Sequence, residues 1–236
     1  MENRNHTKTP GIILIICGIG WFIPLFFYFI LLPAAGSSAV HAQYPLQFLP
    51  WMIESGAVRE GLWYTSGFAF MLNFLFVPYI MFKISGSSVD YFSIAGFLAG
   101  ICGFLVIVIS IFMLAGGEMP LALSYTATND PAVQEAVVAI YNYQRIMTAV
   151  LFDFLGFVCL GIWILFCSIC GLKNNRPKFL QWLGLITAAA CFCFAFGYIL
   201  QISWLGEMGI GLLSFLFIPV WTIGNGVMLI TGKTGR

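Results

Sequence analysis

The sequence has little charge, and that shortage excludes an ordinary water-soluble fold. Only 8% of the 236 residues are charged and 61% are hydrophobic, with a mean hydropathy of +0.97. A soluble globular chain carries roughly 25% charged residues. The formal net charge is only +1, so the sequence also offers no basic surface for nucleic acid.

Histidine is equally scarce, and its scarcity excludes several classes of cofactor site. The two histidines, His6 and His41, lie outside every long apolar run. The chain therefore cannot supply paired histidine ligands for a membrane haem or a histidine cluster for a di-iron site. No lysine lies deep in an apolar run, and phosphate loops and dinucleotide motifs are absent. We expect no cofactor, no metal and no enzymatic activity.

What the sequence does have is apolar length. A bilayer core about 30 Å thick needs about 20 consecutive, mostly apolar residues per helix. Six runs meet this requirement, at residues 11–32, 62–84, 91–115, 145–171, 179–202 and 208–231. Each run is too long and too uniformly apolar for a porin strand. The sequence predicts an all-α fold in which residues 1–236 form one integral membrane domain, a polytopic bundle of six transmembrane helices.

The distribution of lysine and arginine predicts the orientation of this bundle. Eight of the ten basic residues fall on one side of the predicted spans, and Arg59 and Arg145 are alone on the other. Short loops rich in basic residues stay in the cytoplasm. We therefore expect both termini to be cytoplasmic, in a membrane such as the bacterial inner (plasma) membrane.

Residues 33–61 form the first of two longer outer segments, which we expect to be interfacial or helical. Residues 44–53 of this segment are aromatic and rich in proline, and they are too few to span a bilayer. Tryptophan and tyrosine favour the level of the lipid headgroups. We expect these residues to anchor the chain at the outer interface, and the alternative is a lid over a cavity that opens outward.

Residues 116–144 form the second outer segment, which contains a helix start. Asp130 is a good N-cap, and Pro131 suits the first helical position. A straight helix from there through the fourth span would cover about forty residues, about 60 Å. We expect instead a bend, or a separate helix on the outer surface.

Asp153 is the sharpest functional signal, because it is an ionisable residue inside a predicted span. It lies eight residues beyond Arg145, about 12 Å along the helix. Its candidate partners in an intramembrane polar site are Arg145, Asn73, Asn225 and Gln201. Asp153 could be a proton or cation site, or the floor of an outward-facing pocket. It could equally make a structural hydrogen bond between helices.

Glycine residues recur within the predicted spans. Small residues let the backbones of membrane helices approach closely, so these positions indicate packing rather than chemistry. The candidate helix-packing positions are Gly96, Gly100, Gly156 and Gly161.

Two stretches carry a family resemblance. They are RPKFLQWLGLITAAACFCFAFGYIL (residues 176–200), with a basic-Pro-x-x-Leu-x-x-Leu-Gly entry, and FIPVWTIGNGVMLI (residues 217–230), with a Trp-x-x-Gly exit. In these features the chain resembles an uncharacterised domain-of-unknown-function group of bacterial six-helix integral membrane proteins. The resemblance implies the six-helix architecture and brings no activity or site residues.

These features favour a non-catalytic integral membrane protein, an accessory or structural subunit that interacts with lipid and with a membrane protein partner or a second copy of itself. The alternative is a small transporter or ligand-binding membrane protein with an outward-facing pocket based on Asp153. An enzyme would need Asp153 to converge with an outer acid such as Glu118 or Glu54, and nothing in their spacing requires this.

Overall fold

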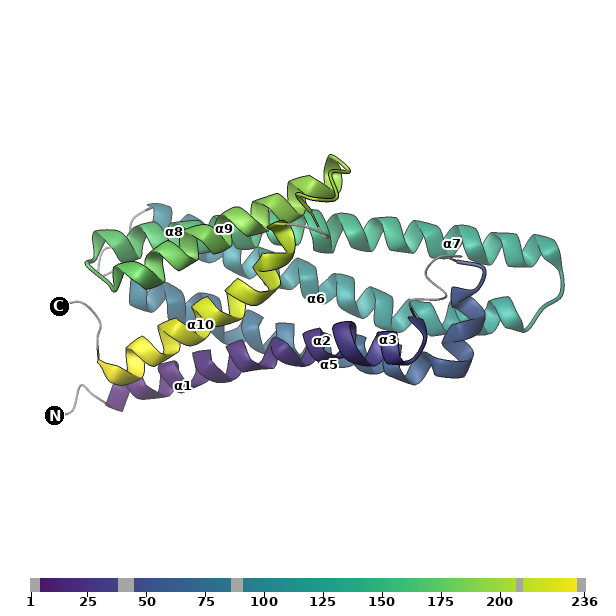
Figure 1. Cartoon of the computed structure of the whole chain (residues 1–236), viewed down its shortest axis with the longest axis horizontal. Helices are drawn as coiled ribbons and strands as arrows, with labels where there is room; N and C mark the ends of the chain where they lie inside the picture. The colour runs from purple at the N-terminus through teal and green to yellow at the C-terminus, as the bar shows by residue number, and fades with distance from the viewer. Residues whose placement is uncertain (1–4, 38–44, 86–90, 207–209, 233–236) are drawn as a thin grey trace.

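The structure is a computed structural model that describes residues 5–37, 45–85, 91–206 and 210–232. Within these ranges every regular element is helical, which confirms the predicted all-α fold. In chain order the elements are α1 (Asn5–Gly20), α2 (Phe22–Phe26), the π-helical η2 (Phe27–Leu31), α3 (Leu32–Ala34), α5 (Phe48–Ser85), α6 (Tyr91–Thr126), α7 (Pro131–Ala149), the π-helical η3 (Val150–Gly156), α8 (Phe157–Lys173), α9 (Lys178–Ile199), the 3₁₀-helical η4 (Ile210–Leu212) and α10 (Leu213–Thr231). Together they form an elongated bundle (Figure 1).

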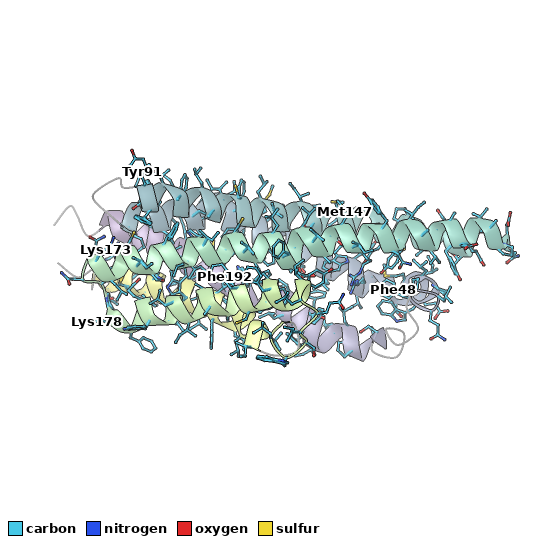
Figure 2. All side chains as sticks on the ribbon, turned by 90° about the horizontal axis from the view of Figure 1, so that it is seen from above. Phe48, Tyr91, Met147, Lys173, Lys178 and Phe192 are labelled. Atoms are coloured by element: carbon cyan, nitrogen blue, oxygen red, sulfur yellow. The ribbon has the colours of Figure 1, made fainter. Side chains whose placement is uncertain are left out.

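Six helices in the described part of the chain are long and apolar enough to cross a membrane, as the sequence predicts. They are Lys8–Ala34, Phe48–Ile84, Tyr91–Thr126, Pro131–Lys173, Lys178–Ile199 and Ile210–Thr231. The start of α1 and the end of α10 lie at the same end of the bundle (Figure 1). Lys173 and Lys178 lie at this end too, opposite Phe48 (Figure 2). We call it the basic end and the opposite end the far end.

The six helices differ in length, and the first, Lys8–Ala34, has 27 residues. α9 and the η4–α10 segment have 22 residues each, about 33 Å, which suits a single crossing of a bilayer. α5 has 38 residues, α6 has 36, and α7, η3 and α8 form one helix of 43, so these run about 54 to 65 Å. At the far end, α5, α6 and α7 continue well past α9 and α10 (Figure 1). We call α3 with residues 48–62, 113–126 and 131–149 the far-end extension.

The expectation of a bend or a separate helix after Pro131 was wrong. α7 runs through η3 into α8 as one helix. It stays straight because it packs along α6, which itself continues to Thr126. Val137 and Tyr141 of α7 are buried in this packing. The π-helical η3 adjusts the turn of the helix without interrupting it.

A second hydrophobic core fills the far-end extension and includes Phe48, Leu49, Trp51 and Met52 of the segment expected to be a surface anchor or a lid. The fully buried members at the start of α5 are Phe48, Leu49 and Met52. The ring of Phe48 lies 5.8 Å from that of Tyr141 on α7, centroid to centroid. Trp51 Nε1 donates a hydrogen bond to Ala35 O at 2.9 Å and so ties α5 to the end of α3. Leu46 and Ile53 of the same segment remain 61% and 41% exposed, and Tyr44 lies outside the described residues. The anchoring of this segment at the interface stays a prediction.

Glycines let the membrane helices approach one another closely. A Cβ added at Gly11 would lie 2.7 Å from Gly226 O, so α1 and α10 cross backbone to backbone. Each of the four glycines proposed to pack helices faces a bulky side chain of another helix. The pairs are Gly96 with Phe166, Gly100 with Trp163, Gly156 with Ile107 and Gly161 with Phe192. At these points the helix spacing depends on the missing side chain.

A Gly100→Ala substitution should lower the stability of the bundle. The new Cβ would lie 2.8 Å from Cγ and Cδ1 of Trp163, a ring that is fully buried, and such overpacking costs about 1–3 kcal/mol. Gly116→Ala on the same helix is the matched control, because no atom lies within 4 Å of its added Cβ. Because alanine has a higher helix propensity than glycine, Gly116→Ala should leave the stability of the protein unchanged or raise it by up to about 1 kcal/mol. Thermal unfolding in one detergent compares the two, and equal Tm values would contradict this contact between α6 and α8.

Candidate functional site

A buried ion pair lies in the far-end extension between α5 and α6. Arg59 Nε donates to Glu118 Oε2 at 3.0 Å, and Arg59 Nη2 donates to Oε1 at 3.1 Å. This is the two-pronged geometry in which an arginine and a carboxylate bind most strongly. Only 3% of Arg59 and 1% of Glu118 is exposed, so neither charge is compensated by solvent.

Aromatic side chains complete the surroundings of this pair. Trp63 lies one helical turn after Arg59 on α5, and its Nε1 donates to Glu118 Oε2 at 2.7 Å. The guanidinium carbon of Arg59 lies 4.5 Å from the Trp63 ring centroid and 5.2 Å from that of Phe48. A cation over aromatic faces is stabilised by their π electrons, most strongly where water is absent. The pair is therefore held by hydrogen bonds and by cation–π contacts.

The arrangement suits a structural role. Both carboxylate oxygens of Glu118 already accept hydrogen bonds. Oε1 accepts one from Arg59, and Oε2 accepts one from Arg59 and one from Trp63. Among the described residues, no group of three or more histidine, cysteine or acidic side chains is placed to hold a metal. Glu118 is thus engaged with Arg59, and the geometry fixes α5 against α6.

Arg59 and Glu118 were not predicted to pair, because they fall in two separate outer segments, each expected to be interfacial or helical. The missed signal is their similar distance from the basic end. Arg59 lies 24 residues before Lys83 on α5, and Glu118 lies 27 residues after Tyr91 on α6, about 36 and 41 Å along continuous helices. Opposite charges at matched heights on neighbouring helices are candidates for a pair.

Asp153 lies in η3 and is half-buried. Its two sequence neighbours pack in different directions: the ring of Phe152 lies 6.2 Å from Phe70 on α5, and that of Phe154 lies 6.0 Å from Phe196 on α9. Gly156 faces Ile107 on α6. The π-helical turn thus contacts three helices, and Arg145 lies half-buried two turns away on α7.

Two of the three amides proposed as partners of Asp153 donate hydrogen bonds to backbone carbonyls. Asn73 Nδ2 donates to Cys17 O at 3.3 Å and to Ala69 O at 2.8 Å, which links α5 to α1. Asn225 Nδ2 donates to Trp221 O within α10 at 2.8 Å. Gln201 follows α9 with a positive φ of 56° and is exposed. The hydrogen bonds of Asn73 and Asn225 therefore connect neither residue to Asp153.

A groove of about 290 Å³ lies on the outside of the bundle between α5 and α6, away from Asp153. Its lining residues are Phe74, Leu75, Pro78, Tyr79, Phe97 and Ile101. All six side chains are apolar or aromatic, so the groove suits a lipid chain rather than a polar solute.

α7 presents an apolar face that no other described helix covers. Val137, Tyr141 and Thr148 are its buried residues. A second row of exposed residues, spaced alternately three and four apart, consists of Val133, Ala136, Ile140, Tyr143, Met147 and Val150, the last of which opens η3. We call this row the α7 stripe. Its central members, Ile140 and Tyr143, are 55% and 67% exposed.

Comparison with known proteins adds no relative: no family model, no curated protein and no solved structure matches the chain. The resemblance drawn from residues 176–200 and 217–230 stays a prediction. The function is therefore argued from the geometry of the bundle.

Glu118→Gln should destabilise the protein strongly. The substitution keeps the shape of the side chain but leaves the Arg59 charge buried without its counter-ion, which costs about 3–5 kcal/mol. Glu54→Gln is the matched control, because Glu54 is exposed on the same extension and its loss should change stability by less than about 0.5 kcal/mol.

The double variant Arg59→Met with Glu118→Leu separates charge from packing. Replacing both partners by apolar residues of similar size removes the charge and the counter-charge together, so stability should return to the wild-type level or above it. Thermal unfolding of the four proteins in one detergent gives the comparison. A Glu118→Gln variant as stable as Glu54→Gln would contradict the buried pair.

Proposed function

We propose that the protein is a non-catalytic accessory subunit of a membrane complex that binds a partner helix along the α7 stripe. The partner is another membrane protein or a second copy of this chain. The observation that carries the proposal is an exposed apolar row on a helix that extends beyond the thickness of a bilayer.

The position of the bilayer follows from helix length. A hydrocarbon layer about 30 Å thick takes up about 20 helical residues. Counted from Lys173 at the basic end, this layer ends near Asp153, and counted from Lys83 it ends near Trp63. The 22-residue α9 and η4–α10 have the matching length. Ile140 lies 13 residues beyond Asp153, about 20 Å farther along the helix.

The outer half of the α7 stripe therefore meets water unless another protein covers it. Contiguous exposed apolar residues on a water-facing surface mark interaction sites. Alternating spacings of three and four are those of the seam in a two-helix coiled coil. The neighbouring positions Ala139, Gln144 and Ile146 are uncharged, so an apolar helix, including α7 of a second copy, can approach without charge repulsion.

The far-end extension offers this surface in a preformed state. The Arg59–Glu118 pair fixes α5 against α6, and the second core fixes α7 through Tyr141. Binding to a rigid surface loses less conformational entropy than binding to a flexible one. This rigidity supports a docking role.

The location that fits this role is a bacterial inner (plasma) membrane with both termini in the cytoplasm. The basis is the predominance of lysine and arginine at the basic end, which the positive-inside rule places in the cytoplasm. The far-end extension and the α7 stripe would then stand outside the cytoplasm.

One observation favours the alternative of a small transporter or ligand-binding protein. Asp153 is a half-buried acid in a π-helical turn, and π-helical turns occur frequently at functional sites. A pocket based on Asp153 would make it the site of proton or cation binding.

Photocrosslinking in native membranes tests the docking role. A benzophenone amino acid in place of Tyr143 should give an adduct with the partner, because Tyr143 is in the middle of the stripe. The same probe in place of the exposed Asn142, which lies on the polar side of α7, should not. An adduct of twice the 26.1 kDa chain mass would identify a second copy, and any other mass a different subunit. No adduct at Tyr143, or equal adducts at both positions, would contradict the proposal.

Proton movement across vesicles tests the alternative. Proteoliposomes with an entrapped pH-sensitive dye should hold an imposed pH gradient as well as protein-free vesicles do, for wild type and for Asp153→Asn alike. This result is expected because the accessory role needs no ionisation of Asp153. A gradient that collapses with wild type and persists with Asp153→Asn would instead establish the transport function.

A further inference from the structure

Arg176 is a buried cation at the basic end, in the short link between α8 and α9. Only 8% of the residue is exposed. The link is folded back on the end of α8: the backbone N–H of Arg176 donates to Gly171 O at 3.0 Å, and that of Asn174 to Cys170 O at 3.0 Å. Asn175 between them has a positive φ of 53°. Arg176 is therefore held in place by the turn.

No described carboxylate lies near this guanidinium. The acidic residues in the described ranges are Glu54, Glu60, Glu118, Asp130, Glu135 and Asp153. The acidic residue nearest to Arg176 on the helices that flank the turn is Asp153. It lies 20 residues before Lys173, about 30 Å along the helix. Burial lowers the pKa of Arg176, and the nearby thiols of Cys167 and Cys170 act in the opposite direction and raise it. Because arginine stays protonated in proteins, Arg176 carries a buried charge without a carboxylate partner among the described residues.

Other hydrogen-bond donors surround the turn. Gln181, in the first turn of α9, is 2% exposed, and its Nε2 has no hydrogen-bond partner. Its amide lies against Gly171, the residue whose carbonyl accepts from Arg176. Pro177, the N-cap of α9, supplies no side-chain cap for the N–H groups that open this helix. Lys173 and Lys178 are exposed on either side (Figure 2).

The same turn lies where lipid headgroups are expected. It joins two membrane helices at the ends of their apolar spans. Phe179 and Trp182 in the first turn of α9 are 80% and 58% exposed. Exposed aromatic rings at the end of a span are typical of the interface between hydrocarbon and water.

From these observations we propose that the α8–α9 turn binds the phosphate group of an anionic phospholipid, with Arg176 as its buried counter-charge and Gln181 as a second donor. Basic pockets between membrane helices on this side of a bilayer are suited to such headgroups. The phosphate supplies the negative charge that the described part of the chain does not provide there. A free phosphate ion has the same chemistry, and the turn would accept it through the same donors.

The test measures the thermal stability of the full-length protein in dodecyl maltoside, a detergent without phosphate. Adding phosphatidylglycerol should raise the Tm of the wild type, because a ligand that binds only the folded state stabilises it. Diacylglycerol with the same acyl chains should not. Arg176→Gln should lose the response to phosphatidylglycerol. Lys83→Gln, which removes an exposed charge at the same end, should keep it.

The outcomes that overturn the proposal are distinct. An equal response to diacylglycerol would show binding of acyl chains, and an equal response of Arg176→Gln would show a general surface effect. A full response to inorganic phosphate alone would make free phosphate the ligand instead of lipid.

Three further measurements distinguish lipid binding from misfolding and from an internal counter-ion. Arg176→Lys keeps the charge and should retain part of the response, and native mass spectrometry should count fewer retained phospholipids on Arg176→Gln than on the wild type. Asp90 lies outside the described residues in the link before α6. If Asp90→Asn lowers the Tm as much as Arg176→Gln does and the wild type ignores phosphatidylglycerol, Asp90 is the counter-ion and the lipid site is excluded.

Discussion

The thickness of a bilayer is the constraint on which the rest of this structure depends. About 30 Å of hydrocarbon takes up about 20 helical residues, and α9 and η4–α10 are close to that length. The 43-residue helix from Pro131 to Lys173, with α5 and α6, is almost twice as long. The parts of α5, α6 and α7 that extend past α9 and α10 must be stabilised with fewer neighbouring helices to bury their side chains. A second core and an ion pair meet that need at the far end.

The Arg59–Glu118 pair sets the alignment of α5 against α6 more than it adds to the free energy of unfolding. Two apolar helices packed side by side can slide past each other with little change in contact area, whereas a two-pronged ion pair permits one alignment. Replacing such a pair by apolar residues is often neutral or stabilising, which leaves specificity of arrangement as its main contribution. The ring of Trp63 and its Nε1 act on both partners, so α5 supplies two of the three groups and α6 must bring Glu118 to them.

The six spans were predictable because each is a long apolar run, and the start of α7 was predictable from its cap. Ala132 N donates to Asp130 Oδ1 at 3.0 Å, as the Asp-Pro pair predicts. The continuation of α6 beyond residue 115 was not predictable, because Gly117 and Pro120 are typical helix breakers. Tertiary contact overrides them: Gln144 of α7 packs on Gly117 and donates to Met113 O.

The candidate sites, like α6, depend on contacts between helices that local sequence patterns do not predict. Asp153 was recognisable as an acid in an apolar run, but its π-helical turn depends on contacts with α5, α6 and α9 that no local pattern contains. In the sequence, Arg59 and Arg176 are both basic residues beside a span, with no sign that either is buried. Their difference emerges only when burial and partners are known, since one has a carboxylate and the other has none among the described residues.

The two buried arginines lie on opposite sides of the apolar layer, and their surroundings explain how each charge is balanced. Arg59 stands beyond the layer inside a protein core, where lipid phosphate cannot reach, so the chain must provide Glu118 itself. Arg176 lies between α8 and α9 at the ends of their apolar spans, where, in the proposed site, a lipid headgroup supplies the anion. In the proposed lipid site, a bound phosphate would hold the α8–α9 turn at the membrane surface, as Glu118 holds α5 against α6.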